Sequence, residues 1–322
     1  MALLEIRALT VEFSGERCIR AVDRVDLSID REERVAIVGE SGSGKSQLLL
    51  GCIGLLAANG RTQGSVRFDG AELIGADDPA AGVRGRGIGF VFQDASGSLT
   101  PHRRIGDQLA EAAVAARGCE WGMALADARR MIERVRLPDA RRCLAQYPHE
   151  LSGGMRQRVA IAAALMSQPR LLFADEPTTA LDVTVQAEVM ALIDELCREL
   201  GMALLLVTHD IGVVAALADR IAVMYAGRIV ECATASVLLA GPGHPYSAGL
   251  LASVPTLADA PGTELRTIAG SPPAPGTAFT GCRFAPRCPR AAMRCRAEDP
   301  PLVARGRAAI ACHFPLTGEG GA

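Results

Sequence analysis

The strongest chemical signal in the sequence is a glycine-rich stretch that ends in lysine and serine, G-E-S-G-S-G-K-S at residues 39–46. Its glycines let backbone N–H groups point at phosphate oxygens, and the N-terminus of a following helix adds a dipole that favours anions. We expect Lys45 to reach the β- and γ-phosphates of a nucleotide and the Ser46 hydroxyl to ligate Mg²⁺. The residues predicted to surround the phosphates are Gly39, Ser41, Gly42, Ser43, Gly44, Lys45 and Ser46.

A second stretch places two carboxylates at the end of an apolar run, L-L-F-A-D-E at residues 171–176. Ligands of α/β sheets bind at the C-terminal ends of the strands, which is where Asp175 falls. Asp175 is predicted to hold Mg²⁺ through water, and Glu176 to act as the general base that polarises an attacking water. Such a run alone also describes a solvated strand end, so its weight comes from the phosphate-binding stretch upstream.

A third stretch, L-S-G-G-M-R-Q-R at residues 151–158, opens a long helical pattern. Ser152 is a favoured N-cap residue, and Gly153 and Gly154 leave the helix N-terminus without bulky side chains. Ser152 and the neighbouring N–H groups are therefore predicted to approach a phosphate. The alternative is an ordinary capped helix.

These stretches are positioned by strands that alternate with helices. Strands are predicted at residues 65–68, 88–92, 171–174, 203–208 and 221–224, with a helix over 183–200 and a helical region over about 105–166. Alternation of this kind indicates a parallel sheet covered on both faces. We expect an α/β fold of the P-loop NTPase type, with a mixed but largely parallel sheet, a helical subdomain at about 95–166 and a small C-terminal extension. The domains are predicted at 1–235 and 236–322, the latter containing a Pro- and Gly-rich connector at 258–280.

Composition excludes several classes of protein. The chain has 322 residues, a formal net charge of −2 and 49% hydrophobic residues, which argues against general disorder and against a nucleic-acid partner. No run of about 18 apolar residues is present, and the N-terminus lacks a basic leader, so we expect a protein at the cytoplasmic face that reaches the membrane through a partner.

Taken together, the three stretches resemble the ABC transporter ATPase family, and further residues fall in that family's order. By resemblance, Gln93 contacts Mg²⁺ and faces the membrane partner, and the segment 180–182 (Ala-Leu-Asp, with Asp182) lies across a dimer interface. His209 matches the histidine that contacts the γ-phosphate. Phe13 lies where the family stacks an aromatic ring on adenine, although a core phenylalanine is an alternative there.

The resemblance implies that two ATP molecules are sandwiched in a dimer, in which the Ser152 segment of one subunit closes on the ATP of the other. It implies a second ABC ATPase subunit, which we expect to be a different chain, together with two transmembrane permeases. An extracytoplasmic solute-binding protein would act indirectly.

Further segments are similar to the oligopeptide and dipeptide importer branch, above all His-Pro-Tyr at 244–246 followed by Ala-Gly-Leu-Leu at 248–251. The implied function is that of an ATP-hydrolysing motor for di- or oligopeptide uptake. The same motor role for nickel or glutathione, and a soluble non-transport ABC ATPase, are the alternatives.

Four of the ten cysteines gather near the end of the chain, at Cys282, Cys288, Cys295 and Cys312. Four thiolates can hold a 4Fe-4S cluster or tetrahedral Zn²⁺, and unligated structural cysteines remain a third interpretation. The spacing is neither that of a zinc ribbon nor that of a bacterial ferredoxin. The resemblance favours iron–sulfur, because some peptide-importer subunits carry a 4Fe-4S cluster in this extension. Seven arginines between residues 283 and 307 would offset its negative charge. RNA binding by these arginines is disfavoured, because no aromatic residues alternate regularly with them.

Overall fold

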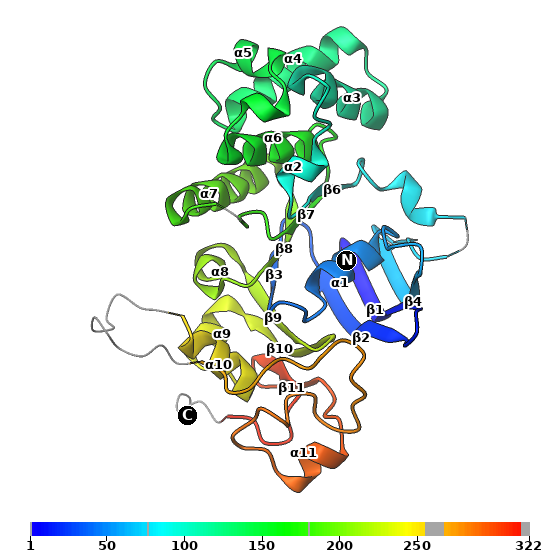
Figure 1. Cartoon of the computed structure of the whole chain (residues 1–322), viewed down its shortest axis with the longest axis vertical. Coiled ribbons are helices and arrows are strands. Elements are labelled where there is room, and N and C mark those ends of the chain that lie inside the picture. Colours follow the sequence, from blue (N-terminus) through cyan, green and yellow to red (C-terminus); the bar gives the residue numbers. More distant parts are fainter. Residues whose placement is uncertain (1, 76, 180, 255–266, 317–322) are drawn as a thin grey trace. The chain divides into compact units, whose positions relative to one another are not determined.

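The computed structural model describes residues 2–75, 77–179, 181–254 and 267–316 (Figure 1). The chain divides into two compact units. Unit 1 comprises Met1–Ile29, Arg34–Asp78 and Val207–Ala322, and unit 2 comprises Asp30–Glu33 and Pro79–Leu206.

Unit 1 begins with an antiparallel sheet in the order β2-β1-β4-β5. Its strands are β1 (Leu4–Phe13), β2 (Ile19–Ile29), β4 (Gly60–Phe68) and β5 (Ala71–Glu72). Apolar side chains such as Ile6, Leu9 and Val66 are fully or almost fully buried on one face of this sheet. Phe13 ends β1 opposite Ile19 of β2 and Gly60 of β4.

The second group of strands in unit 1 is mixed and has the order β11-β12-β10-β9-β3. These strands are β3 (Arg34–Val38), β9 (Arg220–Tyr225), β10 (Arg228–Thr234), β11 (Val303–Arg305) and β12 (Ala308–Ile310). β3 runs parallel to β9, and the other pairs are antiparallel. The helices of this unit are α1 (Lys45–Cys52), α8 (Ile211–Leu217), α9 (Ala235–Ala240), α10 (Pro245–Ala252) and α11 (Met293–Ala297).

Unit 2 combines parallel strands with a helical layer that includes α3 to α6 (Figure 1). β6 (Ile88–Val91) pairs in parallel with β7 (Leu171–Asp175), and β8 (Ala203–Thr208) follows β7 in the strand order. The helices are η1 (Pro79–Gly82), α2 (Ala95–Ser98), α3 (Ile105–Arg117), α4 (Trp121–Arg134), α5 (Ala140–Ala145), η2 (Pro148–Glu150), α6 (Gly153–Leu165) and α7 (Val183–Leu200).

The α/β fold expected from the alternation of strands and helices is confirmed. The helix predicted over 183–200 and the strand predicted over 203–208 coincide with α7 and β8. The strand predicted at 65–68 is only the last part of β4, which begins at Gly60, because the polar first half of β4 lacks the apolar pattern of a buried strand. The short strands β11 and β12 have no sequence prediction, since three residues are too few to show alternation.

Phe173 tests the packing of unit 2, because it lies at the centre of β7 with no exposed surface and meets the Phe90 ring edge-on at 6.1 Å between centroids. Phe173→Ala should lower the free energy of unfolding by about 3–5 kcal/mol, measured by urea denaturation, because it leaves a cavity. Met123→Ala is the control, since that side chain is 61% exposed and should change little. Equal stability of the two variants would contradict the assigned core.

Candidate nucleotide site

The phosphate loop, residues 39–44, connects the buried strand β3 to helix α1. No side chain caps the N-terminus of α1, whose N-cap residue Gly44 has a φ of 103°. A Cβ atom on Gly39 would lie 2.2 Å from the carbonyl oxygen of Met224, and one on Gly44 would lie 2.2 Å from that of Ala21. Glycine is therefore required at both positions, because the loop packs directly against neighbouring backbone.

The opposite side of the phosphate loop is open. Ser41 and Gly42 are exposed, and nothing lies within 4 Å of a Cβ built on Gly42. Lys45 is only 4% exposed, and its ammonium donates to the carbonyl oxygens of Gly39 at 2.9 Å and Glu40 at 3.0 Å. The loop thus combines a fixed cation with backbone that a ligand can reach, which is an arrangement suited to phosphate.

Three contacts hold the phosphate loop in place. The N–H of Gly227 donates to the Ser43 carbonyl at 2.8 Å, and the N–H of Glu40 donates to the Tyr246 hydroxyl at 2.8 Å. The Glu40 carboxylate forms an ion pair with Arg287, and the side-chain hydrogen bond between the two is the largest cause that raises the pKa of Arg287. In the sequence, Arg287 is only one of seven arginines between residues 283 and 307, and Tyr246 is only part of a branch marker.

In unit 2, two carboxylates with different surroundings lie at the C-terminal end of β7. Asp175 ends the strand with 6% of its surface exposed, whereas Glu176 is half-buried and has a φ of 44°. A positive φ is costly for glutamate, and strained backbone of this kind is concentrated at functional sites. Glu176 Oε2 accepts a hydrogen bond from Thr179 Oγ1 at 3.0 Å and one from Gln93 Nε2 at 3.4 Å. The structure therefore brings Gln93 and Glu176 together.

Helices α6 and α7 present their N-termini next to each other. Ser152 caps α6 by accepting from the Met155 N–H at 3.3 Å, and Asp182 caps α7 by accepting from the Val185 N–H at 3.0 Å. A Cβ on Gly154 would lie 3.0 Å from Val185 Cγ1, so the two helices pack closely at this point. Both caps are exposed, which makes them accessible to another molecule. Ala180, the first residue of the predicted interface segment, lies outside the described residues.

The remaining predicted residues belong to unit 1. His209 directly follows β8 and is exposed, and Phe13 is half-buried at the end of β1. The phosphate loop, Lys45, Ser46, Phe13 and His209 thus belong to unit 1, whereas Gln93, Ser152, Asp175, Glu176 and Asp182 belong to unit 2.

The four C-terminal cysteines line one small cavity of about 10 Å³, together with residues that include Phe284, Arg290 and His313. The N–H of Cys282 donates to the carbonyl of Cys295 at 2.8 Å, which fixes two segments of the cavity wall to each other. Burial raises the pKa of Cys282 to about 11 and also raises the pKa of Cys288 and of Cys312. Across the part of the chain that the structure describes, no group of three or more His, Cys, Asp or Glu residues is arranged to hold a metal ion.

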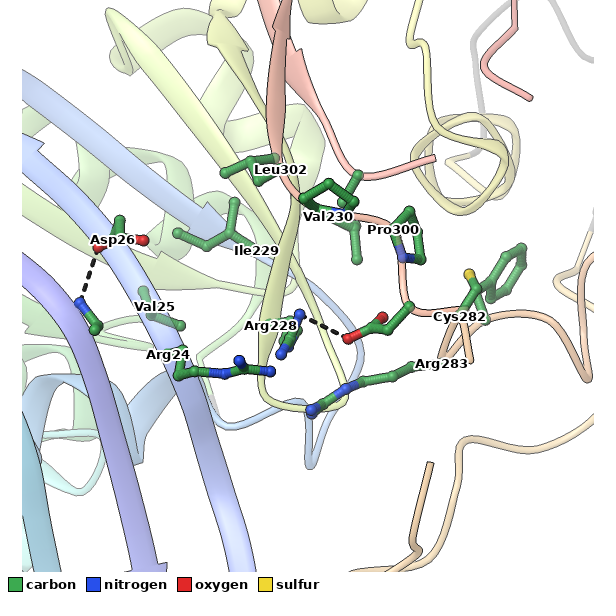
Figure 2. A pocket seen from close by; sticks show the side chains of 15 residues that line it. Arg24, Val25, Asp26, Arg228, Ile229, Val230, Cys282, Arg283, Pro300 and Leu302 are labelled. Carbon is green, nitrogen blue, oxygen red and sulfur yellow. Dashed lines mark hydrogen bonds and ion pairs between the residues drawn. The ribbon is translucent and has the colours of Figure 1, made fainter. Parts of the chain in front are cut away.

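A larger cavity of about 350 Å³ lies beside the cysteines, between β2, β10 and the C-terminal segment (Figure 2). Arg228 and Arg283 both contact Asp23, and Arg228 also pairs with Asp299 at 2.6 Å. Burial acts to raise the pKa of Asp23, but attraction to Arg283, Arg228 and Arg24 and a hydrogen bond from Arg228 together lower it, so the charges beside this cavity compensate one another. No helix among the described residues has the length and apolar character needed to cross a membrane.

Comparison with known proteins agrees with this geometry. Residues 22–179 match the family described as "ABC transporter", and residues 230–295 match "Oligopeptide/dipeptide transporter, C-terminal region". The chain is 45% identical to the oligopeptide transport ATP-binding protein OppD of Salmonella typhimurium, covering 98% of this chain and 94% of OppD. It is 43% identical to AppD of Bacillus subtilis, over 94% of this chain and 93% of AppD.

Among solved structures, the chain is similar to the dimeric ATP-binding cassette MJ0796 in a post-hydrolysis state bound to ADP and Pi. The TM-score is 0.64 at 32% identity, covering 72% of this chain and 98% of that one. The similarity to OppD extends over nearly the full length of both proteins, beyond the cassette alone. The chain therefore belongs to the ABC transporter family of ATP-binding proteins, in the branch that carries the oligopeptide/dipeptide transporter C-terminal region.

Proposed function

We propose that this chain is the ATP-hydrolysing motor subunit of an importer for dipeptides or oligopeptides. The observation that carries the proposal is the phosphate loop, where the buried Lys45 lies beside exposed glycine backbone at an uncapped helix N-terminus. Peptides are the proposed solute because relatives that match nearly the whole chain are named as oligopeptide transport proteins.

In the proposed reaction, water attacks the γ-phosphorus of ATP, the bond to the β–γ bridging oxygen breaks, and ADP and phosphate are released. Lys45 binds the β- and γ-phosphates, and His209 contacts the γ-phosphate. Glu176 accepts the proton of the attacking water. Its hydrogen bonds with Thr179 and Gln93 support this role, because they fix the direction of the carboxylate.

Ser46, Gln93 and Asp175 are the residues proposed to hold Mg²⁺, and Phe13 is proposed to stack on adenine. A hydroxyl, an amide and a carboxylate supply the oxygen ligands that Mg²⁺ prefers. When bound, the metal would neutralise charge that develops on the phosphate oxygens.

The site is proposed to be completed by a second ABC ATPase subunit. Exposure of the Ser152 cap supports this step, because one subunit would offer this helix N-terminus to the γ-phosphate held by the other. Asp182, exposed at the neighbouring helix cap, would lie across the same interface. We propose a heterodimer that binds two membrane permeases at the cytoplasmic face, with a solute-binding protein on the far side and no nucleic acid.

The proposed domain organisation is an ABC ATPase domain at 1–235, with its helical subdomain at about 95–166, and a C-terminal extension at 236–322. Within the extension, the cysteines at 282, 288, 295 and 312 are proposed to hold a 4Fe-4S cluster, with Zn²⁺ as the alternative. Support comes from the shared cavity, since the four cysteines line one small space and four thiolates are the donor set that either group uses.

Glu176→Gln should keep nucleotide binding and remove most turnover, about a 10²–10⁴-fold loss, because the amide cannot accept the proton of the attacking water. Phosphate release measures the rate, and size exclusion with ATP should show a trapped dimer. Glu195→Gln is the control, since Glu195 lies on α7 and pairs with Arg136 at the surface. A normal rate in the Glu176 variant would refute the assigned base.

Full-length protein purified without oxygen from iron-replete cells should be brown and should contain iron and sulfide. Cys288→Ser should lose this colour, whereas Cys18→Ser should keep it, because Cys18 is exposed and does not line the cavity. Colourless protein that contains zinc would support the alternative, and metal-free protein would exclude both.

Reconstituted with its permeases and solute-binding protein, the chain should hydrolyse ATP faster when peptide is added. The reason is that loading the binding protein would favour closure of the ATPase dimer. Stimulation by nickel or glutathione instead of peptide would reassign the solute. Copurification with nucleic acid and without permeases would favour a soluble ATPase.

A further inference from the structure

The second residue of the phosphate loop, Glu40, forms an ion pair with Arg287 of the C-terminal extension. Arg287 Nη1 donates to Glu40 Oε2 at 2.6 Å, and Arg287 Nη2 donates to Glu40 Oε1 at 3.0 Å. The Arg287 side chain is 5% exposed and that of Glu40 is 26% exposed. A bidentate pair that is this well shielded fixes both position and orientation, unlike a surface ion pair.

Arg287 is itself held rigidly. Its Nε donates to the Ala269 carbonyl at 2.9 Å, and its Nη2 donates also to the Ile268 carbonyl at 3.3 Å. Nη1 reaches the Tyr225 hydroxyl at 3.4 Å, and the guanidinium lies 5.8 Å from the centre of the Tyr225 ring. Every nitrogen of the guanidinium is therefore engaged, so Arg287 can act as a fixed support for Glu40.

The backbone of Glu40 connects this support to the lysine that would bind phosphate. Its carbonyl accepts from Lys45 Nζ at 3.0 Å, while its N–H donates to the Tyr246 hydroxyl at 2.8 Å. Side chain, N–H and carbonyl of one residue are thus all fixed. Arg287 and Tyr246 therefore hold Glu40 in the orientation in which its carbonyl accepts from Lys45 Nζ.

Tyr246 is held as firmly as Arg287. It has no exposed surface, and its ring centre lies 4.6 Å from that of Tyr225 and 5.4 Å from that of Phe284. Its N–H donates to Nδ1 of His244 at 3.0 Å, and the buried carboxylate of Glu231 accepts from the His244 N–H at 2.9 Å. The His-Pro-Tyr segment therefore begins helix α10, which His244 caps, and the Tyr246 hydroxyl accepts a hydrogen bond from the phosphate loop.

A second route joins the same part of the extension to the phosphate loop. Arg283 donates to the Ala226 carbonyl and to Asp23, and the N–H of the next residue, Gly227, donates to the Ser43 carbonyl at 2.8 Å. In Figure 2, Arg283 lies beside Cys282 at the cavity wall. Arg283 follows Cys282 in the chain and Arg287 precedes Cys288, so each arginine is the sequence neighbour of a cysteine that lines the four-cysteine cavity.

We propose that Arg287 is a positioning residue of the nucleotide site, which sets the Glu40 carbonyl that receives Lys45 and so makes the C-terminal extension part of the ATP-binding machinery. The inference rests on the proposed function, because it assumes that this loop binds ATP. Arg287 touches neither nucleotide nor reacting atoms in this scheme and acts only through Glu40. We therefore predict that substitution of Arg287 changes nucleotide affinity more than it changes the rate of turnover.

The test measures binding of a fluorescent N-methylanthraniloyl derivative of ATP to the full-length chain. Arg287→Met should raise the dissociation constant about tenfold, because a charge-assisted bidentate pair is lost and the Glu40 carboxylate loses its partner. Arg287→Lys should recover only part of the affinity, because lysine cannot make the paired contact. Tyr246→Phe should weaken binding by a smaller factor.

Arg294→Met is the matched control, since Arg294 is in the same extension but pairs with Glu298 at the exposed surface.

A double-mutant cycle separates positioning from general damage. If Arg287 acts through Glu40, the variant that combines Glu40→Gln with Arg287→Met should bind no more weakly than Arg287→Met alone. In the assembled transporter, KM for ATP should rise while kcat changes by less than KM does. Additive losses in the cycle, or a kcat loss with unchanged KM, would overturn the proposal.

Two further outcomes decide between this inference and the proposed function. A lower melting temperature of Arg287→Met with unchanged nucleotide affinity would mean that Arg287 only fastens the extension, and this would overturn the inference alone. Lys45→Ala provides the reference, because it should abolish binding in an otherwise folded chain. Wild-type protein that binds no nucleotide would instead refute the proposed function itself.

Discussion

The phosphate loop depends on a close approach between backbone segments that leaves no room for a Cβ atom. Gly39 lies against the carbonyl of Met224 at the end of β9, and Gly44 lies against the carbonyl of Ala21 in β2. The loop is thus packed against β9 and β2, whereas nothing lies within 4 Å of a Cβ built on the exposed Gly42. A phosphate site requires a loop that is packed on one side and has exposed backbone on the other. In such a loop the N–H groups are already oriented before the ligand binds.

The C-terminal extension adds a second constraint on the same loop. Arg287 and Tyr246 both fix Glu40, and Arg283 fixes the turn whose Gly227 N–H binds the Ser43 carbonyl. Tyr225, Tyr246 and Phe284 pack against one another and are almost fully buried, and the low dielectric of such surroundings strengthens hydrogen bonds. The extension is therefore built into the nucleotide-binding unit and contributes to its shape.

Unit 2 supplies chemistry of a different kind. The strained backbone of Glu176 holds its carboxylate within reach of Thr179 and Gln93, whereas Ser152 and Asp182 cap the N-termini of their helices at the surface. A strained, oriented carboxylate suits proton abstraction, and exposed helix caps suit a contact made by a second subunit. The residues proposed for chemistry and those proposed for assembly thus lie in structurally distinct settings.

The sequence by itself determined the α/β class, the helix and strand that became α7 and β8, and the phosphate loop, because these depend on local spacing and periodicity. It also indicated that four cysteines could act together. Only the tertiary structure decided that those cysteines line one cavity, and that Arg287 reaches Glu40 from 247 positions away. Contacts of that kind have no signature in local sequence, since any of the seven arginines between residues 283 and 307 satisfies the same pattern and the folded chain alone selects one.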